Sequence, residues 1–211
     1  MKSGLAVLAS GRGTNLQAII DAWEHGTLPV DIVGVLSNNP TAQALDRARS
    51  CGIPTAVLRL KDYPDRRSYG EALVKQLQDW QTDLVALAGF MLLLDPVVIE
   101  AFPHRILNIH PALLPSFKGI NAQQQALDYG VRVTGCTVHL VDEDMDTGPI
   151  ILQAAVPVLP NDTEETLAAR ILTEEHRLYP EAIRLLAAGR IKVCGRKVRI
   201  LAKGEDNIDQ N

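Results

Sequence analysis

The sequence predicts an α/β fold with a doubly wound, mainly parallel sheet and an antiparallel C-terminal hairpin, and three observations support this prediction. Short apolar runs typical of strands alternate with segments whose apolar residues recur at helical spacing. The run DLVALA at 83–88 is apolar at nearly every position, as expected of a parallel strand covered on both faces. Later, two strand-like runs are separated only by DEDMDTG, which is too short for a helical crossover and predicts a hairpin.

The first half of the chain is expected to consist of strand–helix units. Strands are expected at 4–9, 31–37, 54–58 and 83–88, and helices at 14–25, 42–50, 66–80 and 95–102. Gly52 closes the second helix, and Pro96 lies in the first turn of the fourth, where a proline costs no hydrogen bond. Because parallel neighbours need right-handed crossovers, these units are expected to form one sheet with helices on both faces.

The pattern changes in the second half. Expected there are a strand at 105–109, a helix at 121–129, two hairpin strands at 133–141 and 149–158, and a small terminal hairpin at 191–201 around Gly195. A long helix is expected from about Thr163, and Pro180 is expected to kink or divide it because proline has no amide proton to donate. We expect residues 204–211 to form a disordered tail.

Composition places the chain among ordinary globular proteins. Of its 211 residues, 46% are hydrophobic and 22% are charged, and the net charge is −4. No strongly basic stretch is present, so nucleic acid is not an expected partner. No run approaches the ~18 apolar residues of a membrane span, and the N-terminus lacks the pattern of a signal peptide. The chain is therefore expected in the cytoplasm, without a membrane partner.

Neither the cysteines nor the histidines indicate a metal site. Cys51, Cys136 and Cys194 are far apart and form no CxxC pair, so we interpret them as small apolar residues in a reducing compartment. The histidines other than His110 show no metal-ligand spacing with one another. No bound metal is expected.

The first candidate site is the segment SGRGTN, between the first expected strand and the first expected helix. Gly13 allows a positive φ and a close approach, while Thr14 and Asn15 add hydroxyl and amide donors beside the free N–H groups of a helix N-terminus. Leu16 occupies the third glycine position of a dinucleotide fingerprint, so a single phosphate fits better than a dinucleotide. A plain β–α turn is the alternative.

The second candidate is the pair Asn108 and His110, where the strand at 105–109 ends. Ligands of parallel α/β sheets collect at the carboxyl ends of strands, and alternation sends both side chains to one side and Ile109 to the other. An amide and an imidazole that converge there can polarise a carbonyl and move a proton. The alternative is that both satisfy backbone groups of the following loop.

Two carboxylates complete the set of candidates. DEDMDTG at 142–148 is either a solvated turn, a calcium loop, or a loop that folds one acid inward to orient a histidine; Asp146, before Thr147-Gly148, is the best placed for the last role. Glu175 falls on the apolar stripe of the late helix, where a carboxylate is costly unless it binds something, such as a ribose diol. A slightly rotated helix that exposes Glu175 is the alternative.

Five segments together resemble the folate-dependent formyltransferases. They are SGRGTNLQAI, LAGFM, NIHPALLPSFKG, GCTVH and DTGPIILQ, and the resemblance runs from about residue 5 to residue 187. NIHP-x-LLP with a downstream D-x-GP is quite specific for the family, and the SGRGTNLQ opening points to its ribonucleotide-dependent branch. The resemblance implies direct formyl transfer from 10-formyltetrahydrofolate to the glycinamide amine of 5′-phosphoribosylglycinamide, a step of purine synthesis, without a metal.

The resemblance also implies roles for residues that match the family motifs. The implied catalytic set is Asn108, His110 and Asp146; the ribonucleotide would be bound by Gly13, Thr14, Asn15 and Glu175, and the folate by Arg66, Met91, Leu92, Leu93, Leu94, Asn108, Asp142 and Asp146. Leu92 stands where many relatives carry an arginine, and the adjacent Arg67 is the alternative to Arg66 as the folate-contacting arginine.

The implied chemistry is attack of the amine on the formyl carbon, which produces a tetrahedral oxyanion. Asn108 and a protonated His110 would stabilise that charge, and Asp146 would favour the imidazolium and hold its orientation. We expect a single domain over 1–203, with a nucleotide- and phosphate-binding half at 1–104 and a catalytic and folate-binding half at 105–203. It would act on small molecules as a monomer or weak homodimer.

Other functions make different demands on the sequence. A methionyl-tRNA formyltransferase would need a further, usually basic, C-terminal domain, and a formyltetrahydrofolate hydrolase usually carries an N-terminal regulatory domain. A nucleotide-binding module without catalysis would not need Asn108, His110 and Asp146 together. A nicotinamide-dependent dehydrogenase would need the missing glycine and an acid at the end of its second strand.

Overall fold

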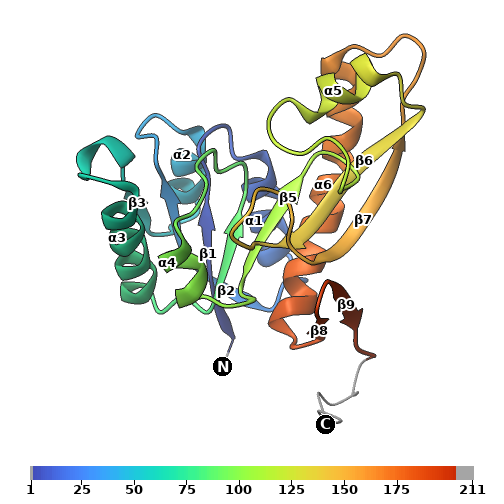
Figure 1. Ribbon diagram of the computed structural model, residues 1–211. Coiled ribbons are helices and arrows are strands. Elements are labelled where there is room, and N and C mark those ends of the chain that lie inside the picture. The colour runs from blue at the N-terminus through green and yellow to red at the C-terminus, as the bar shows by residue number, and fades with distance from the viewer. Residues whose placement is uncertain (1, 203–211) are drawn as a thin grey trace.

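A seven-stranded sheet forms the centre of the molecule, which we describe from a computed structural model over residues 2–202 (Figure 1). The strand order is β3-β2-β1-β4-β5-β6-β7. The strands are β1 (Ser3–Leu8), β2 (Val30–Ser37), β3 (Thr55–Val57), β4 (Leu84–Leu87), β5 (Ile106–His110), β6 (Val133–Leu140) and β7 (Ile150–Pro157). β1 to β5 pair in parallel, and β6 is antiparallel to both of its neighbours. The predicted doubly wound, mainly parallel sheet is confirmed.

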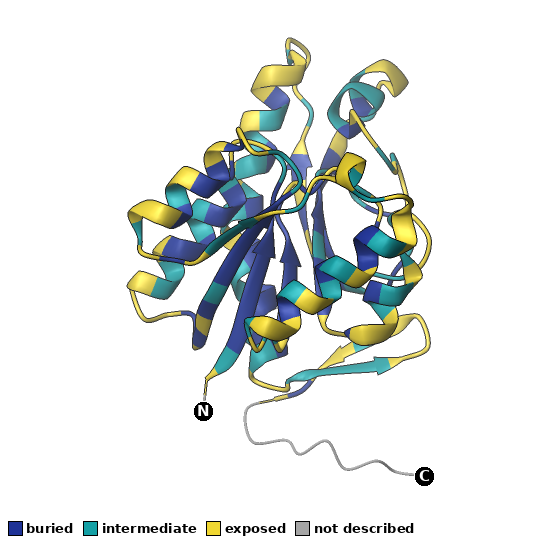
Figure 2. Ribbon diagram, turned by 90° about the vertical axis from the view of Figure 1, so that its left-hand side faces the viewer, coloured by how far each residue is buried: buried dark blue, intermediate teal, exposed yellow. Residues whose placement is uncertain are grey.

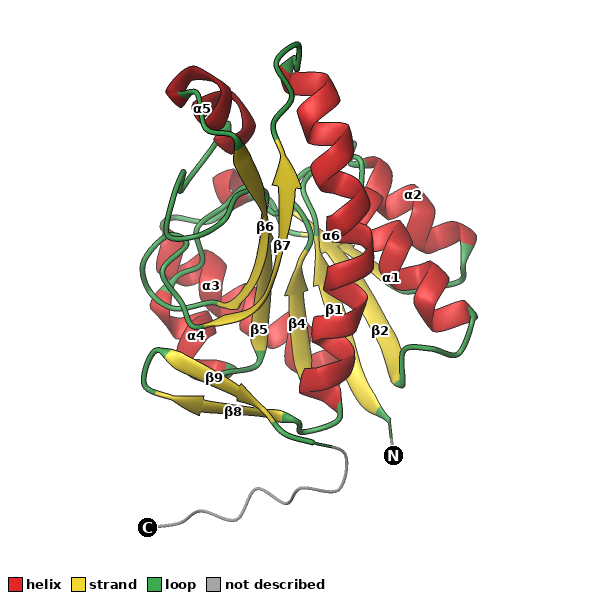
Figure 3. Cartoon of the chain, turned by 90° about the vertical axis from the view of Figure 1, so that its right-hand side faces the viewer, coloured by secondary structure: helices red, strands yellow, loops and turns green. Residues whose placement is uncertain are grey.

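Helices cover both faces of this sheet. They are α1 (Thr14–Glu24), α2 (Gln43–Ser50), the 3-10 turn η1 (Leu60–Asp62), α3 (Arg66–Asp79), α4 (Pro96–Ala101), α5 (Ala122–Tyr129) and α6 (Glu164–Ala187). α1, α2 and α6 lie on one face, and α3 and α4 on the other (Figure 3). The alternation within β1 divides the core accordingly: Leu5 and Val7 pack on the first face, and Ala6 and Leu8 on the second.

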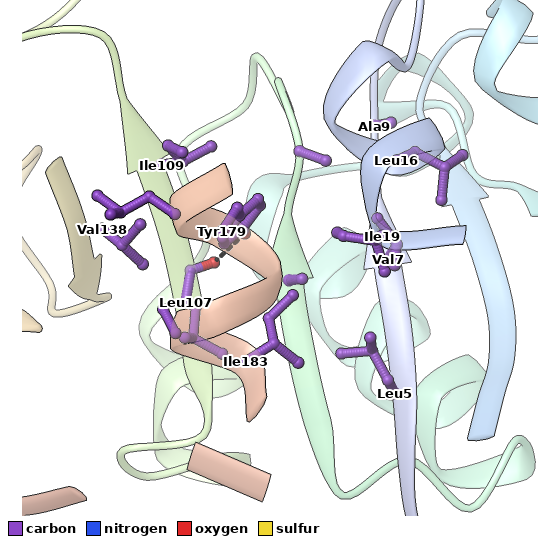
Figure 4. Close-up of a cluster of buried hydrophobic side chains, with 14 of the residues drawn as sticks. Leu5, Val7, Ala9, Leu16, Ile19, Leu107, Ile109, Val138, Tyr179 and Ile183 are labelled. Atoms are coloured by element: carbon purple, nitrogen blue, oxygen red, sulfur yellow. Dashed lines mark hydrogen bonds between the residues drawn. The ribbon is translucent and has the colours of Figure 1, made fainter. Parts of the chain in front are cut away.

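The strands in the middle of the sheet are buried almost throughout (Figure 2). Figure 4 shows the core beneath α1 and α6, where Leu107 and Ile109 of β5 face the helix side. Since side chains alternate along a strand, Asn108 and His110 point to the opposite face. The burial of the two apolar side chains of β5 on the helix side thereby places its amide and its imidazole on the opposite face.

The carboxyl ends of β1 and β4 meet where the winding of the sheet reverses. The chain passes from β1 outward to β2 and β3, then returns to β4 and continues to β5 in the other direction. After β1, the Ser10 amide donates to the Gly89 carbonyl at 3.0 Å, and the Met91 amide donates to the Ser10 hydroxyl at 2.8 Å. Such a reversal leaves a crevice at the edge of an open α/β sheet.

Pro180 does not divide the late helix, contrary to one outcome expected from the sequence. α6 runs unbroken from Glu164 to Ala187 with Pro180 inside it. Tyr179 and Ala182 near the proline are buried, and the Tyr179 hydroxyl donates to the carbonyls of Leu87 at 2.8 Å and Leu107 at 3.1 Å. The packing of these neighbours outweighs the loss of one helical hydrogen bond.

The chain then forms the predicted terminal hairpin, β8 (Ile191–Cys194) and β9 (Lys197–Ile200), which turns at Gly195 with φ +60°. β9 packs beside β7, and Leu201 is buried. The tail expected at 204–211 lies outside the described residues. Within residues 2–202, no helix has the length and apolarity that a bilayer crossing needs.

Candidate active site

An amide, two imidazoles and a carboxylate converge beside β5. The pairing of β5 with β6 sets Asn108 opposite His139 and His110 opposite Thr137. Oδ1 of Asp146 lies 3.4 Å from Asn108 Nδ2 and 3.6 Å from His139 Nε2. Its Oδ2 lies 3.3 Å from His110 Nδ1 and accepts the Gly119 amide at 2.8 Å. Residues separated by up to 38 positions therefore form one cluster around a single carboxylate.

The loop at 142–148 folds back toward β5 through unusual backbone geometry. Asp146 has φ +53°, which ordinary residues rarely adopt. Gly148 is packed so closely that a Cβ would lie 1.8 Å from the Leu140 carbonyl oxygen. The Thr147 hydroxyl donates to Asp142 Oδ1 at 2.6 Å. Among the four acids of the loop, Asp146 is the one whose side chain is buried in this cluster, with 9% of it exposed.

Opposing effects set the charge of the Asp146 carboxylate. Burial alone would raise its pKa, but the neighbouring His139 imidazole, the hydrogen bond from the Gly119 amide and the charge of His110 lower the pKa below its ordinary value. The carboxylate is therefore ionised at neutral pH.

Burial decides the charge of His110. It lowers the imidazole pKa below 6.5, although the Phe117 carbonyl and the Asp146 charge both act to raise it. Asp146 favours the imidazolium as expected from the sequence, but desolvation outweighs it. In the free protein at pH 7 the ring is neutral.

The neighbours of His110 also fix which nitrogen carries the proton. Nε2 lies 2.7 Å from the Phe117 carbonyl oxygen, which can only accept, so Nε2 is the donor. The neutral ring then presents an unprotonated Nδ1 to Asp146 Oδ2. Two acceptors that face each other at 3.3 Å form a site with room for one proton. The pair is arranged to take up a proton.

His139 belongs to this cluster although the sequence pattern does not predict it, because its spacing from the other histidines only excluded a metal site. Its Nε2 lies 3.2 Å from Asn108 Nδ2, and its Nδ1 donates to the Leu140 carbonyl at 2.8 Å. The signal that could have found it is the hairpin pairing, because that register puts His139 opposite Asn108.

A cavity of about 530 Å³ opens beside this cluster. Its walls include Asn108, His110, His139 and Asp146, the stretch from Met91 to Leu94, and Asp142 of the loop. Arg66 does not line it. The guanidinium donates to the Leu93 carbonyl at 2.7 Å and lines a smaller cavity of about 180 Å³ on the other side of Met91–Leu93. Arg67 is instead exposed and paired with Glu71, so Arg66 is the arginine next to the cavities.

The SGRGTN segment forms a second cluster with α6. Gly13 has φ +70° and caps α1, and a Cβ there would lie 2.8 Å from Ala44 Cβ. No side chain caps α1, so the amides of its first turn, from Thr14 onward, remain available as donors. Asn15 Nδ2 donates to Glu175 Oε2 at 2.8 Å.

Glu175 is buried, with 6% exposed, and burial raises its pKa against the opposing hydrogen bond from Asn15. Asn15 Oδ1 is buried without a hydrogen-bond partner among residues 2–202. These residues do not line the 530 Å³ cavity, because they lie on the α1–α6 face of the sheet. The structure thus divides the candidate residues into two clusters near one sheet edge.

Metal-binding geometry is not found in the described part of the chain, where no three His, Cys, Asp or Glu side chains are arranged to hold an ion. The polar groups of the cluster are those of proton transfer and hydrogen bonding. A doubly wound sheet with a carboxylate–imidazole pair at its carboxyl edge and an uncapped helix N-terminus nearby is an arrangement typical of α/β enzymes. The chain belongs to the formyl transferase family, whose sequence pattern it matches over residues 3–183.

Known relatives agree with this assignment. The chain is 42% identical to phosphoribosylglycinamide formyltransferase of Escherichia coli (strain K12) over 189 residues, 90% of this chain and 89% of that protein. It is 47% identical to trifunctional purine biosynthetic protein adenosine-3 of Bos taurus over 205 residues, which are 97% of this chain but 20% of that longer protein. The crystal structure of glycinamide ribonucleotide transformylase 1 from Symbiobacterium toebii superposes with a TM-score of 0.94 at 53% identity, over 95% of each chain.

Proposed function

We propose that this chain transfers the formyl group of 10-formyltetrahydrofolate to the glycinamide amine of 5′-phosphoribosylglycinamide, in purine (IMP) biosynthesis. The observation that carries the proposal is the Asp146–His110 pair, with its place for one proton, inside a ligand-sized cavity at the carboxyl edge of the sheet. The names and high identities of the relatives support the choice of substrates.

The folate is proposed to occupy the 530 Å³ cavity as a co-substrate. Its pterin would bind the backbone of Met91, Leu92, Leu93 and Leu94, with Asp142, Asp146 and Asn108 on the opposite wall. Backbone groups can bind the pterin whatever the side chain at each position. Leu92 in place of an arginine therefore removes a positive charge but leaves the proposed backbone contacts. Arg66 would act at the far side of this stretch, where it already holds the Leu93 carbonyl.

The ribonucleotide is proposed to bind from the other face. Its phosphate would accept hydrogen bonds from the first-turn amides of α1 at Gly13, Thr14 and Asn15, where the helix dipole favours an anion. Glu175 would accept hydrogen bonds from the ribose hydroxyls. The unpaired Asn15 Oδ1 beside Glu175 supports this placement, because a hydroxyl there can donate to it.

The proposed reaction is direct attack through a tetrahedral intermediate. The amine lone pair forms the new C–N bond, the formyl C=O pair moves to oxygen, and collapse breaks the bond to the folate N10. The Asn108 amide and His110 would stabilise the oxyanion, each worth about 10²–10³ in rate for donors of this kind. The Asn108 amide and the positive charge that His110 gains with a proton would supply the charge stabilisation, so no metal is needed in the proposal.

The proton that leaves the amine must reach N10, and the His110–Asp146 pair would carry it. Because the free pair is unprotonated on its facing atoms, it can accept the proton, and the developing oxyanion then favours the imidazolium. The carboxylate would return the proton to N10, directly or through a water.

We also infer a single domain over 1–203 with two functional halves. The phosphate turn and α1 precede residue 104, whereas Asn108, His110 and Asp146 follow it; Glu175 is the one ribonucleotide-binding residue that the second half would contribute. The enzyme is proposed to act in the cytoplasm on small molecules, as a monomer or weak homodimer.

The test is an assay of purified protein with 10-formyl-5,8-dideazafolate and phosphoribosylglycinamide. We expect deformylated folate to appear only when the ribonucleotide is present. Equal rates without it would replace the transferase by a hydrolase. Binding of the ribonucleotide without any turnover would support a binding module instead.

A further inference from the structure

The terminal hairpin contacts the loop that carries Asp146. Arg196 lies at the hairpin turn between β8 and β9, and its Nη2 donates to the Thr147 carbonyl oxygen at 2.7 Å. The two residues are 49 positions apart, and Thr147 directly follows Asp146. In Figure 3 the hairpin lies beside the end of the sheet where the β6–β7 loop turns.

Burial and hydrogen bonds fix the terminal hairpin to the body of the protein. Leu201, just after β9, is 4% exposed. The Leu201 amide donates to the Arg190 carbonyl at 2.8 Å, and Arg190 Nε donates to the Leu201 carbonyl at 2.7 Å. Val193 and Val198 pack against the core beneath α6. Arg196 therefore extends from a turn whose base is fixed to the body of the protein.

The loop, in contrast, needs support at Asp146. Its end is fixed at Gly148 by close packing on Leu140, and Thr147 ties it internally to Asp142. Asp146 lies between these points in a left-handed conformation that costs an ordinary residue free energy unless surrounding contacts hold it. The charge-assisted hydrogen bond from Arg196 to the carbonyl of Thr147, the residue after Asp146, is such a contact.

We propose that Arg196 is a positioning residue: by holding the Thr147 carbonyl, it sets the Asp146 carboxylate against His110 and Gly119 and shapes the loop wall of the 530 Å³ cavity. The kinetic part of this inference rests on the proposed function, because it treats the cavity as the folate site. The structural part does not.

Hydrogen exchange in the ligand-free protein tests the structural part. The Gly119 amide reports on Asp146, since it donates to Oδ2. In Arg196→Ala we expect this amide to exchange roughly tenfold faster, the effect of losing about one hydrogen bond to a charged group. Lys197→Ala removes a positive charge next to the same turn and is the matched control. Equal exchange in both variants would overturn the proposal.

Kinetics test the functional part. Arg196→Ala should raise the KM for 10-formyl-5,8-dideazafolate several-fold and lower kcat, while the KM for the ribonucleotide stays within twofold. Arg196→Lys should recover part of the loss, because its ammonium can donate to the same carbonyl. Equal changes in both KM values with a matching fall in Tm, or no recovery by lysine, would assign Arg196 to hairpin stability alone. If the wild-type protein transfers no formyl group, the proposed function fails, and the exchange measurement still decides the role of Arg196.

Discussion

Two buried carboxylates, Asp146 and Glu175, lie on opposite faces of the sheet near the same edge, and their surroundings shift their pKa values in opposite directions. Burial raises the pKa of both. Glu175 has one donor, Asn15, and its pKa stays raised. Asp146 accepts a hydrogen bond from the Gly119 amide and has two imidazoles beside it, and its pKa is lowered. The difference teaches that a donor and neighbouring imidazoles together can outweigh the effect of burial on a carboxylate pKa, and that the single amide donor of Asn15 does not do so for Glu175.

The largest effect should come from breaking the Asp146 cluster. His110→Ala and Asp146→Ala are each expected to lower kcat by about 10³-fold, since each removes a group that is proposed to act in the transition state. Steady-state kinetics measure this, and circular dichroism should show near-normal folding. Glu143→Ala, which removes an exposed carboxylate of the same loop that does not line the cavity, is the control and should leave kcat within twofold. Collapse of the fold in both cluster variants would remove the support for their catalytic assignment.

Substitution of Glu175 should weaken binding of the ribonucleotide instead of slowing the chemical step. Glu175→Gln keeps the shape and can still accept from Asn15, but it loses the negative charge that would hold a ribose diol. We expect the KM for the ribonucleotide to rise about tenfold and the KM for the folate to stay nearly constant. The reverse order of the two KM values would refute the ribose role.

The pH dependence of stability should also distinguish Asp146 from Glu175, because their pKa values are shifted in opposite directions. A lowered folded-state pKa means that Asp146 contributes stability above its unfolded pKa near 3.8, and that this is lost as pH falls through the folded value. A raised pKa means that ionising Glu175 costs stability as pH rises above about 4.5. At pH 7, Asp146→Asn should therefore lower Tm and Glu175→Gln should raise it, by ~2–4 °C for each kcal/mol. Shifts of the same sign would contradict this comparison.

A smaller change is expected at His139. It lowers the pKa of Asp146, so His139→Ala should move the acid limb of the kcat/KM profile to higher pH. The plateau rate should fall only about tenfold, because Asn108 and His110 remain. An unchanged acid limb would show that His139 does not act on the Asp146 carboxylate.

Much of this arrangement could be predicted from the sequence because it follows from local periodicity. Alternating apolar runs predicted the doubly wound sheet, and the position of Asn108 and His110 at a strand end predicted their common direction. The apolar stripe of α6 predicted that Glu175 is buried, and the structure confirms that burial.

The features that were missed depend on contacts between distant segments. His139 joins the cluster through the β5–β6 register, which single-sequence patterns do not specify. The neutral His110 follows from desolvation by the assembled fold, and the unbroken α6 follows from packing around Pro180. Arg196 reaches Thr147 only once the terminal hairpin is packed. None of these has a local signal in the sequence.

The most direct test of the division between the two carboxylates is the single-turnover rate of formyl transfer with both substrates saturating. Under these conditions weakened binding is compensated and only the chemical step is measured. Glu175→Gln should react within a few-fold of the wild-type rate, whereas Asp146→Asn should be slower by about 10³-fold. Equal losses in the two variants would contradict the assignment of binding to one carboxylate and proton transfer to the other.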